Sequence, residues 1–379
     1  MKIAVPAETD ETRVAVTPET VKKFIALGAD VAVQTCAGAQ SRIPDADYAA
    51  AGAKITPDAA TTLLDADIIL KVRRPTETEL KAYKQGSLVI ATMDPYGNEA
   101  ALKAMAAAGV AAFAMELMPR ITRAQSMDVL SSQANLAGYQ AVIDAAGEYD
   151  RALPMMMTAA GTVPAARVFV MGAGVAGLQA IATARRLGAV VSATDVRPAA
   201  KEQVESLGAK FIAVEDDEFK QAETAAGYAK PMSAEYQAKQ AALVAEHIKK
   251  QDIVITTALI PGRPAPKLIT AAMVSSMRPG SVLVDLAVER GGNVEGAKLG
   301  ETVDVNGVKI VGHANVPGRI AASASALYAR NLYTFVETLI DKAAKAVAVK
   351  WDDELVKATN LTRDGKVVHP SFAGEGAKA

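Results

Sequence analysis

The sequence predicts an α/β protein with two Rossmann-like, doubly wound parallel-sheet domains and a cleft between them. Apolar runs of strand length alternate with helical segments along most of the chain, a pattern typical of parallel sheets covered by helices. One glycine-rich strand-turn-helix-strand unit begins at Arg167. The chain has 379 residues, of which 50% are hydrophobic, which is enough for about two domains with separate cores.

The first third of the chain supplies the first domain. We predict strands at Lys2–Val5, Asp30–Gln34, Asp67–Val72, Leu88–Thr92 and Ala111–Leu117, and helices at Pro18–Leu27, Asp45–Ala51 and Asn98–Ala108. Pro18 suits the first turn of a helix, where its missing N–H needs no partner. A helix expected at 321–349 returns to this domain, which is therefore discontinuous and comprises residues 1–136 and 320–379.

The second domain is predicted to comprise residues 137–319. An apolar helix starts near Leu136, and a polar helix is expected at Ser233–Lys250. The run Met155–Met157 is interpreted as core packing. After the glycine-rich unit, strands are predicted at Lys210–Val214, Asp252–Thr257, Ser281–Asp285 and Val308–Val311.

The glycine-rich unit predicts a nucleotide cofactor. Its turn comprises Gly172, Gly174, Val175, Ala176 and Gly177. The first glycine permits a tight turn after the strand, the second leaves room for a pyrophosphate, and the third lets the following helix pack close to the strand. The amides at the N-terminus of that helix face the anion. A glycine-rich turn without a ligand is the alternative, and a second strand that ends in Asp195 argues against it.

Asp195 also bears on the identity of the cofactor. A carboxylate at this position accepts hydrogen bonds from the adenosine ribose and repels a 2′-phosphate, which favours NAD over NADP. Val196 and Arg197 follow and are predicted to line the same site. Arg197 is compatible with a 2′-phosphate, with a solvated turn and with a cation near the pyrophosphate, so its role stays open.

Composition argues against several classes of protein. A formal net charge of −1 without a dense basic stripe argues against binding to nucleic acid or anionic lipid. The single cysteine, Cys36, excludes an intrachain disulfide and fits a reducing cytoplasm. We predict no metal, because no cluster has metal-ligand spacing. We also predict a soluble chain without membrane insertion, because it has no signal segment and its longest apolar helix carries Arg330 and Asp341.

A polar run over residues 119–135 interrupts the alternation. Its cation, amide, carboxylate and hydroxyl side chains are enough to orient a nicotinamide ribose. They belong to Arg120, Gln125, Asp128 and Ser131. A helix cap explains Asp128 or Ser131 individually but explains the set less well. A second long segment, 215–251, contains Tyr228. We consider two interpretations of this segment, a lid over the cofactor and a plain surface insertion.

Several longer motifs point to one family. They are Glu11–Glu19, Lys71–Pro75, Met115–Gln133, Gly227–Lys230, Thr256–Gly262, Asp285–Asn293 and Gly312–Pro317. The first two motifs, the glycine turn and Asp285–Asn293 resemble the alanine dehydrogenase and nicotinamide nucleotide transhydrogenase superfamily. The other four motifs look like its transhydrogenase branch. The resemblance covers essentially the whole chain.

The resemblance implies the NAD(H)-binding component, domain I, of a proton-translocating transhydrogenase, of the separate alpha-1 type. The implied partners are an NADP(H)-binding domain III, a membrane domain II and a second copy in a homodimer, with the chain peripheral to the inner membrane on the cytoplasmic side. The four residues of the polar run are implied to surround the nicotinamide end of NAD(H). The other residues implied at the cofactor are Tyr228, Thr257, Ala258, Leu259, Glu289 and Asn315.

Alanine dehydrogenase is the main alternative. Alanine dehydrogenases of the family place a histidine just after the strand that here reads Leu88–Thr92, where this chain has Met93–Tyr96, and an aspartate in place of Glu289. Arg13 and Lys71, which grip the substrate in those enzymes, are kept. Hydride exchange between two nicotinamides moves no proton in the chemical step and needs no such histidine. A non-catalytic NAD-binding module is a further alternative.

The three histidines of the chain are assigned separately. His247 and His369 are interpreted as solvated, because they lie in a charged helix and in a polar tail. His313 lies near the expected cleft, where a ligand contact and a hydrogen-bonded loop are both open.

Overall fold

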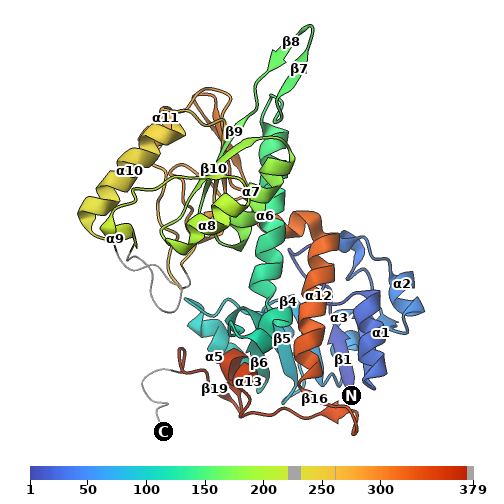
Figure 1. Cartoon of the computed structure of the whole chain (residues 1–379). Coiled ribbons are helices and arrows are strands. Elements are labelled where there is room, and N and C mark those ends of the chain that lie inside the picture. Colours follow the sequence, from blue (N-terminus) through green and yellow to red (C-terminus); the bar gives the residue numbers. More distant parts are fainter. Residues whose placement is uncertain (221–231, 261, 374–379) are drawn as a thin grey trace. The chain divides into compact units, whose positions relative to one another are not determined.

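A computed structural model describes residues 1–220, 232–260 and 262–373 (Figure 1). The chain divides into two compact units. Unit 1 comprises Met1–Gln133 and Pro317–Ala379, and unit 2 comprises Ala134–Val316. The predicted boundaries after residues 136 and 319 lie close to these. Each unit contains one large, mainly parallel sheet, which confirms the predicted α/β class.

The sheet of unit 1 has eight strands in the order β19-β18-β6-β5-β4-β1-β2-β3. They are β1 (Lys2–Val5), β2 (Asp30–Gln34), β3 (Lys54–Thr56), β4 (Ile68–Arg73), β5 (Leu88–Thr92), β6 (Ala111–Ala114), β18 (Asn360–Arg363) and β19 (Lys366–Val367). The first six are parallel, and β18 and β19 are antiparallel. This order is that of a doubly wound sheet, with its switch point between β1 and β4.

Helices and apolar layers cover both faces of this sheet. The helices are α1 (Pro18–Ala26), α2 (Asp45–Ala50), α3 (Ala59–Leu63), α4 (Glu77–Leu80), α5 (Glu99–Ala107), α12 (Ala321–Glu337) and α13 (Glu354–Thr359). Side chains alternate along each strand. In β1, Ile3 and Val5 therefore enter one apolar layer and Ala4 enters the other.

The helix predicted at 321–349 is shorter than expected. It ends at Glu337 and is followed by a small hairpin of β16 (Ile340–Asp341) and β17 (Ala346–Val347). The composition of 342–346 is helical, but the Asp341 carboxylate accepts the backbone N–H groups of Ala343 and Ala344, at 2.8 and 3.0 Å. These local bonds to the backbone compete with helix formation over 342–345, which form the turn of the hairpin instead.

The sheet of unit 2 has seven strands in the order β11-β10-β9-β12-β13-β15-β14. They are β9 (Arg167–Met171), β10 (Val190–Thr194), β11 (Lys210–Phe211), β12 (Ile253–Thr256), β13 (Val282–Asp285), β14 (Thr302–Val305) and β15 (Val308–Val311). All pairings are parallel except that of the edge strand β14 with β15. The switch point lies between β9 and β12, because the chain winds outward in opposite directions from these two strands.

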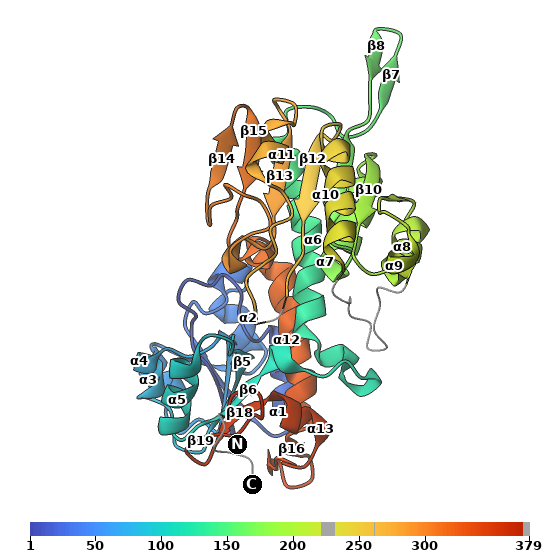
Figure 2. The ribbon, with the colours of Figure 1, turned by 90° about the vertical axis from the view of Figure 1, so that its left-hand side faces the viewer.

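The helices of unit 2 flank its sheet, and one segment projects from it. The helices are α6 (Val129–Glu148), which begins in unit 1, α7 (Val175–Arg186), α8 (Ala199–Ser206), α9 (Asp217–Lys220), α10 (Ala234–Ile248) and α11 (Ala271–Ser275). The projecting segment is a hairpin of β7 (Met156–Thr158) and β8 (Gly161–Val163), visible in Figures 1 and 2. The interpretation of Met155–Met157 as core packing is wrong: 63% of Met155 and 73% of Met157 are exposed.

Candidate functional site

The described residues predicted to bind a cofactor in unit 2, a set that leaves out Tyr228, lie at one edge of its sheet. Each group follows a parallel strand, and the carboxyl ends of such strands share an edge. The glycine turn follows β9, Asp195–Arg197 follows β10, Thr257–Leu259 follows β12, Glu289 follows β13, and Asn315 follows β15. Thr257 donates from its backbone amide to Met171 O at 2.9 Å and from its hydroxyl to Gly172 O at 3.0 Å. The two loops at the switch point are therefore joined directly.

The glycine turn has the geometry of an anion cradle. Gly172 has φ +104°, and a Cβ on Gly177 would lie 1.8 Å from Gly172 O, so neither position accepts a side chain without rearrangement. Gly174 is the N-cap of α7 and provides no side-chain hydrogen bond to it. A Cβ on Gly174 would meet no atom within 4 Å. No side-chain cap occupies the first backbone N–H groups of α7, so they can donate to an external acceptor. The positive end of the helix dipole favours an anion as that acceptor.

Gly138 is a further residue of this site that the sequence did not single out. It lies in α6, and a Cβ there would be 2.0 Å from the backbone oxygen of Ala176 in the first turn of α7. Helix α6 therefore supports the cradle by backbone-to-backbone contact that only glycine permits. The only signal in the sequence was a lone glycine inside a helical pattern, which can indicate that another part of the backbone packs closely against the helix at that position.

The loop after β12 is fixed from behind by a buried amide. Asn293 is fully buried, its Oδ1 accepts from Ala258 N at 3.0 Å, and its Nδ2 donates to Ala258 O at 2.9 Å and to Pro266 O at 2.8 Å. Asp285, which is 1% exposed, accepts from Val294 N at 3.0 Å and so fixes the position next to Asn293. Both residues belong to the motif noted in the sequence, but their partners are up to 35 positions away.

The Asp195 carboxylate accepts four hydrogen bonds. Oδ2 accepts from Ala173 N in the glycine turn at 2.7 Å. Arg197 supplies the other three: its backbone amide and Nε donate to Oδ1, both at 2.9 Å, and its Nη2 donates to Oδ2 at 3.0 Å. Asp195 therefore ties the end of β10 to the glycine turn. Because Arg197 forms this ion pair through two nitrogens, the role of a solvated turn residue does not apply to it.

Two further polar pairs lie after β13 and β15. Glu289, in a short 3₁₀ turn, accepts from Asn315 N at 3.4 Å. His313 Nδ1 lies 3.0 Å from Asp144 Oδ2, and the other Asp144 oxygen accepts from Gln140 Nε2 at 2.8 Å. His313 is thus a hydrogen-bonded loop residue, oriented by a carboxylate of α6, which is one of the two alternatives considered for it.

The other histidines are not solvated as expected. Both are half-buried, and His247 Nε2 lies 2.8 Å from Ser192 Oγ. Burial lowers the pKa of His247, and the cations Lys210 and Lys250 lower it further. His369 Nε2 lies 3.2 Å from Ala358 O. Neither lies at the carboxyl edge of the unit 2 sheet.

The polar run of unit 1 divides into two pairs. Asp128 precedes α6 and accepts from the Ser131 amide at 2.9 Å and from its hydroxyl at 2.5 Å, so these two residues cap the helix together. Arg120 and Gln125 are exposed, and Gln125 lies in the 3₁₀ turn Thr122–Met127. The set therefore combines a helix cap with two outward-facing polar side chains. Tyr228, predicted to lie on a lid, falls outside the described residues.

The switch point of unit 1 is filled by the chain's own charges. Glu8 follows β1, and Lys71 lies in β4 with 2% exposure. Lys71 Nζ is 3.2 Å from Glu8 Oε2 and 2.6 Å from Glu79 Oε1. Burial raises the pKa of Glu8, whereas at Glu79 the attraction of Lys71 outweighs burial and lowers the pKa. Next to this cluster, Arg13 donates from Nε and Nη2 to Glu11, both at 2.8 Å.

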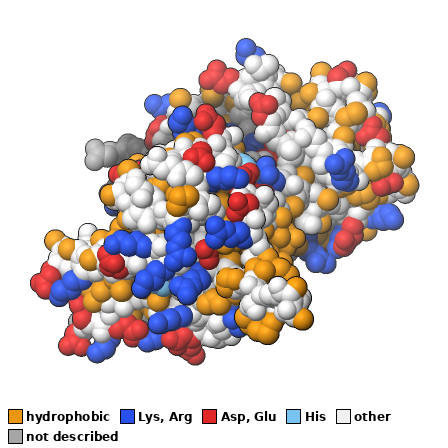
Figure 3. Space-filling model, turned by 90° about the horizontal axis from the view of Figure 1, so that it is seen from above, with side chains coloured by type: hydrophobic (Ala, Val, Ile, Leu, Met, Phe, Trp, Pro, Cys, Tyr) orange, Lys and Arg blue, Asp and Glu red, His pale blue; other side chains and the backbone are white. Residues whose placement is uncertain are grey.

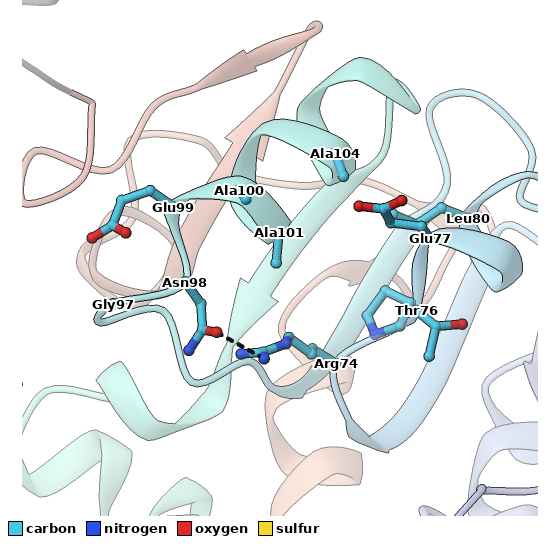
Figure 4. A pocket seen from close by; sticks show the side chains of 11 residues that line it. Arg74, Thr76, Glu77, Leu80, Gly97, Asn98, Glu99, Ala100, Ala101 and Ala104 are labelled. Atoms are coloured by element: carbon cyan, nitrogen blue, oxygen red, sulfur yellow. Dashed lines mark hydrogen bonds between the residues drawn. The ribbon is translucent and has the colours of Figure 1, made fainter.

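A shallow pocket of about 400 Å³ lies beside the end of β5 in unit 1 (Figure 4). Arg74 on its wall donates to Asn98 Oδ1 at 2.9 Å and to the backbone oxygens of Met93 and Asp94 at 3.2 and 3.0 Å. Glu116 accepts the N–H groups of the same two residues. The backbone oxygens of the Met93–Asp94 turn are thus bound by Arg74 and its backbone N–H groups by Glu116.

Comparison with known proteins agrees with this arrangement. The family model for the N-terminal domain of alanine dehydrogenase/PNT matches residues 4–137, and the model for the C-terminal domain matches residues 141–370. The chain belongs to the alanine dehydrogenase/PNT family. Within the described residues, no helix has the length and apolar character needed to cross a bilayer. The same residues contain no group of three or more His, Cys, Asp or Glu side chains able to hold a metal ion.

Members of both branches of the family are similar to the chain. It is 56% identical to an NAD(P) transhydrogenase subunit alpha polypeptide of Rhodospirillum rubrum over 100% of both chains. It is 33% identical to alanine dehydrogenase of Halomonas elongata, covering 98% of this chain and 96% of that one. Among solved structures, transhydrogenase from Sinorhizobium meliloti is 67% identical, with a TM-score of 0.89 over 97% of this chain and 100% of that one. An L-alanine dehydrogenase has 25% identity and a TM-score of 0.82, with 98% of each chain covered.

Proposed function

We propose that the chain is the NAD(H)-binding subunit of a proton-translocating transhydrogenase. It exchanges hydride between NADH on unit 2 and NADP⁺ on a partner domain III, and a membrane partner, domain II, couples the exchange to proton movement. The observation that carries the proposal is the uncapped cradle at the switch point of unit 2, in a chain with 56% identity to a transhydrogenase subunit. We also propose a cytoplasmic location, peripheral to the inner membrane through the complex.

The residues at the carboxyl edge of unit 2 suit NAD(H). We assign the amides of Val175, Ala176 and Gly177, at the end of α7 without a side-chain cap, to the pyrophosphate, and Asp195, next to the glycine turn, to the adenosine ribose. The loop Thr257–Leu259, with Glu289 and Asn315, completes this edge. When bound, NADH supplies the hydride. The chain itself binds and orients, and we assign Arg120, Gln125, Asp128 and Ser131 to positioning at the nicotinamide end.

The same geometry argues against alanine dehydrogenase. The position at which dehydrogenases of the family are expected to carry a histidine holds the Met93–Asp94 turn, whose backbone Glu116 and Arg74 fix from two sides. The turn itself carries no imidazole to move a proton. Lys71 is paired with Glu8 and Glu79, and Arg13 with Glu11, which also pairs with Arg73, so both cations already have carboxylate partners within the chain.

The purified chain is therefore expected to show neither alanine-dependent NADH formation nor NADH-to-NADP⁺ exchange by itself. Adding an NADP(H)-binding domain should restore exchange, because the second nucleotide site is then supplied. Alanine-dependent NADH formation is measured by absorbance. Exchange is measured with the same protein preparation by chromatographic separation of the NADPH formed, because NADH and NADPH absorb alike. Robust oxidation of L-alanine by the pure chain would assign it to the dehydrogenases. NADH binding without exchange in the presence of the partner would instead leave a non-catalytic NAD-binding module.

The chain is expected to bind NADH in preference to NADPH, and Asp195→Asn should weaken NADH binding by about 1 to 3 kcal/mol, because a charged acceptor for the ribose hydroxyls is lost. Fluorescence titration with each nucleotide measures both effects. Equal or tighter binding of NADPH by the unchanged protein would remove Asp195 as the discriminating residue.

We propose a homodimer, and the β7–β8 hairpin supports it. Met155 directly before the hairpin, and Met157 and Val163 within it, place exposed apolar surface away from the sheet, and Figure 3 shows hydrophobic side chains on this face. Burying such side chains favours association. Met155→Glu with Met157→Glu should shift the chain toward the monomer in analytical ultracentrifugation, whereas Val190→Glu, at another exposed apolar site, should not. A double variant that stays dimeric excludes the hairpin from the interface.

A further inference from the structure

Arg197 and Asp195 form a closed two-pronged ion pair beside the glycine turn. Arg197 Nε and Nη2 contact different oxygens of the carboxylate, at 2.9 and 3.0 Å. The Asp195 side chain is 7% exposed and the Arg197 side chain 31%. The carboxylate is thus nearly closed to solvent, while the guanidinium on it reaches the surface.

This pairing uses the acceptor capacity of Asp195. A carboxylate has about four acceptor sites. Asp195 already accepts from Ala173 N, Arg197 N and two guanidinium nitrogens. The two backbone donors belong to the loop framework. A ribose hydroxyl can therefore donate a hydrogen bond to the Asp195 carboxylate only if a hydrogen bond from the Arg197 guanidinium is broken.

We propose that Arg197 competes with the adenosine ribose for the Asp195 carboxylate and so moderates the preference of the site for NADH over NADPH. The inference rests on the proposed binding of NAD(H) to unit 2. When the ribose is bound, the guanidinium leaves at least one carboxylate oxygen but remains next to the ribose, because its backbone amide stays on Asp195 Oδ1. A cation at that position attracts a 2′-phosphate, which Asp195 repels.

Removing the guanidinium should therefore tighten the binding of NADH but not that of NADPH. Arg197→Ala is expected to bind NADH about two- to fivefold more tightly, the range for loss of a competing, partly exposed ion pair. NADPH should bind no more tightly than to the unchanged protein, because its 2′-phosphate loses a cation. Arg197→Lys keeps the charge without the planar fork, and its NADH affinity should fall between the two.

The experiment is fluorescence titration of the full-length chain with NADH and with NADPH. Lys201→Ala is the matched control: it removes one positive charge from the next helix, where Lys201 pairs with Glu215 at 2.6 Å rather than with Asp195. It should leave the NADH-to-NADPH ratio unchanged. In an Asp195→Asn background, Arg197→Ala should produce no tightening, because the competition no longer involves a carboxylate. Circular dichroism confirms that each variant is folded.

The outcomes separate this inference from the proposed function. Weaker NADH binding by Arg197→Ala, or equal tightening for both nucleotides, overturns the competition and makes Arg197 a nucleotide contact or a general charge effect. Tightening that persists in the Asp195→Asn background also overturns it. If the unchanged chain binds neither nucleotide, the proposed function fails and this inference fails with it.

Discussion

Gly138→Ala is expected to lower the free energy of unfolding by about 3 kcal/mol, at the upper end of the usual range for overpacking a close contact. The new Cβ would lie 2.0 Å from Ala176 O and 2.8 Å from Ala176 C, which are backbone atoms with no rotamer by which to move away. To relieve the overlap, α6 and the first turn of α7 must separate. NADH affinity should then fall at least about tenfold, because the amides that we propose face the pyrophosphate lose their alignment.

The same helix provides the control for this substitution. Gly147 is exposed, and a Cβ on it would meet no atom within 4 Å. Gly147→Ala should therefore raise the free energy of unfolding by about 0.5 to 1 kcal/mol, the difference in helix propensity between the two residues. Urea denaturation and NADH titration of both variants provide the measurement. If Gly138→Ala has the stability and NADH affinity of the unchanged chain, α6 is not a support of the cradle.

Arg120→Ala or Gln125→Ala is expected to reduce hydride exchange with the partner's NADP⁺ by about a hundredfold, because a displacement near 1 Å at the reacting rings is enough for such a loss. NADH binding should change far less, since we propose that the glycine turn and Asp195 hold the other end of the cofactor. These two positions are preferable to Asp128 and Ser131, whose mutual hydrogen bonds also cap α6. Exposed side chains can be truncated without disturbing the helix.

The control, Arg123, lies in the 3₁₀ turn that also contains Gln125. Arg123 is 50% exposed and pairs with Asp353 at 2.8 Å. The turn is also attached to α12 through Asn331 Nδ2, which donates to Ser126 O at 2.8 Å. Arg123→Ala should therefore keep the exchange rate while removing the same charge as Arg120→Ala. NADH affinity from fluorescence and exchange in a reconstituted assay are compared for each variant. A parallel fall of affinity and rate in Arg120→Ala would make this run a general binding element.

The local sequence pattern was sufficient to predict those strands that depend only on neighbouring residues. The strands Lys2–Val5, Asp30–Gln34, Leu88–Thr92 and Val308–Val311 agree with the prediction at both ends. The strand expected at Ala111–Leu117 ends at Ala114 and continues as a 3₁₀ turn. In that turn Glu116 accepts the Met93 amide, a partner 23 positions away. Contacts of this kind leave no periodic trace in the sequence.

The sequence by itself determined the α/β class, the position of the glycine turn and the residues that follow each strand of unit 2, because alternation, turn chemistry and strand-helix order are properties of adjacent residues. Tertiary structure decided what those residues do with one another. In the folded chain Arg197 pairs with Asp195, and Glu8 pairs with Lys71 at the switch point of unit 1. Met157 is exposed on a hairpin. Tertiary structure also required glycine at 138, because that requirement comes from the approach of a second helix and not from the helix in which the residue lies.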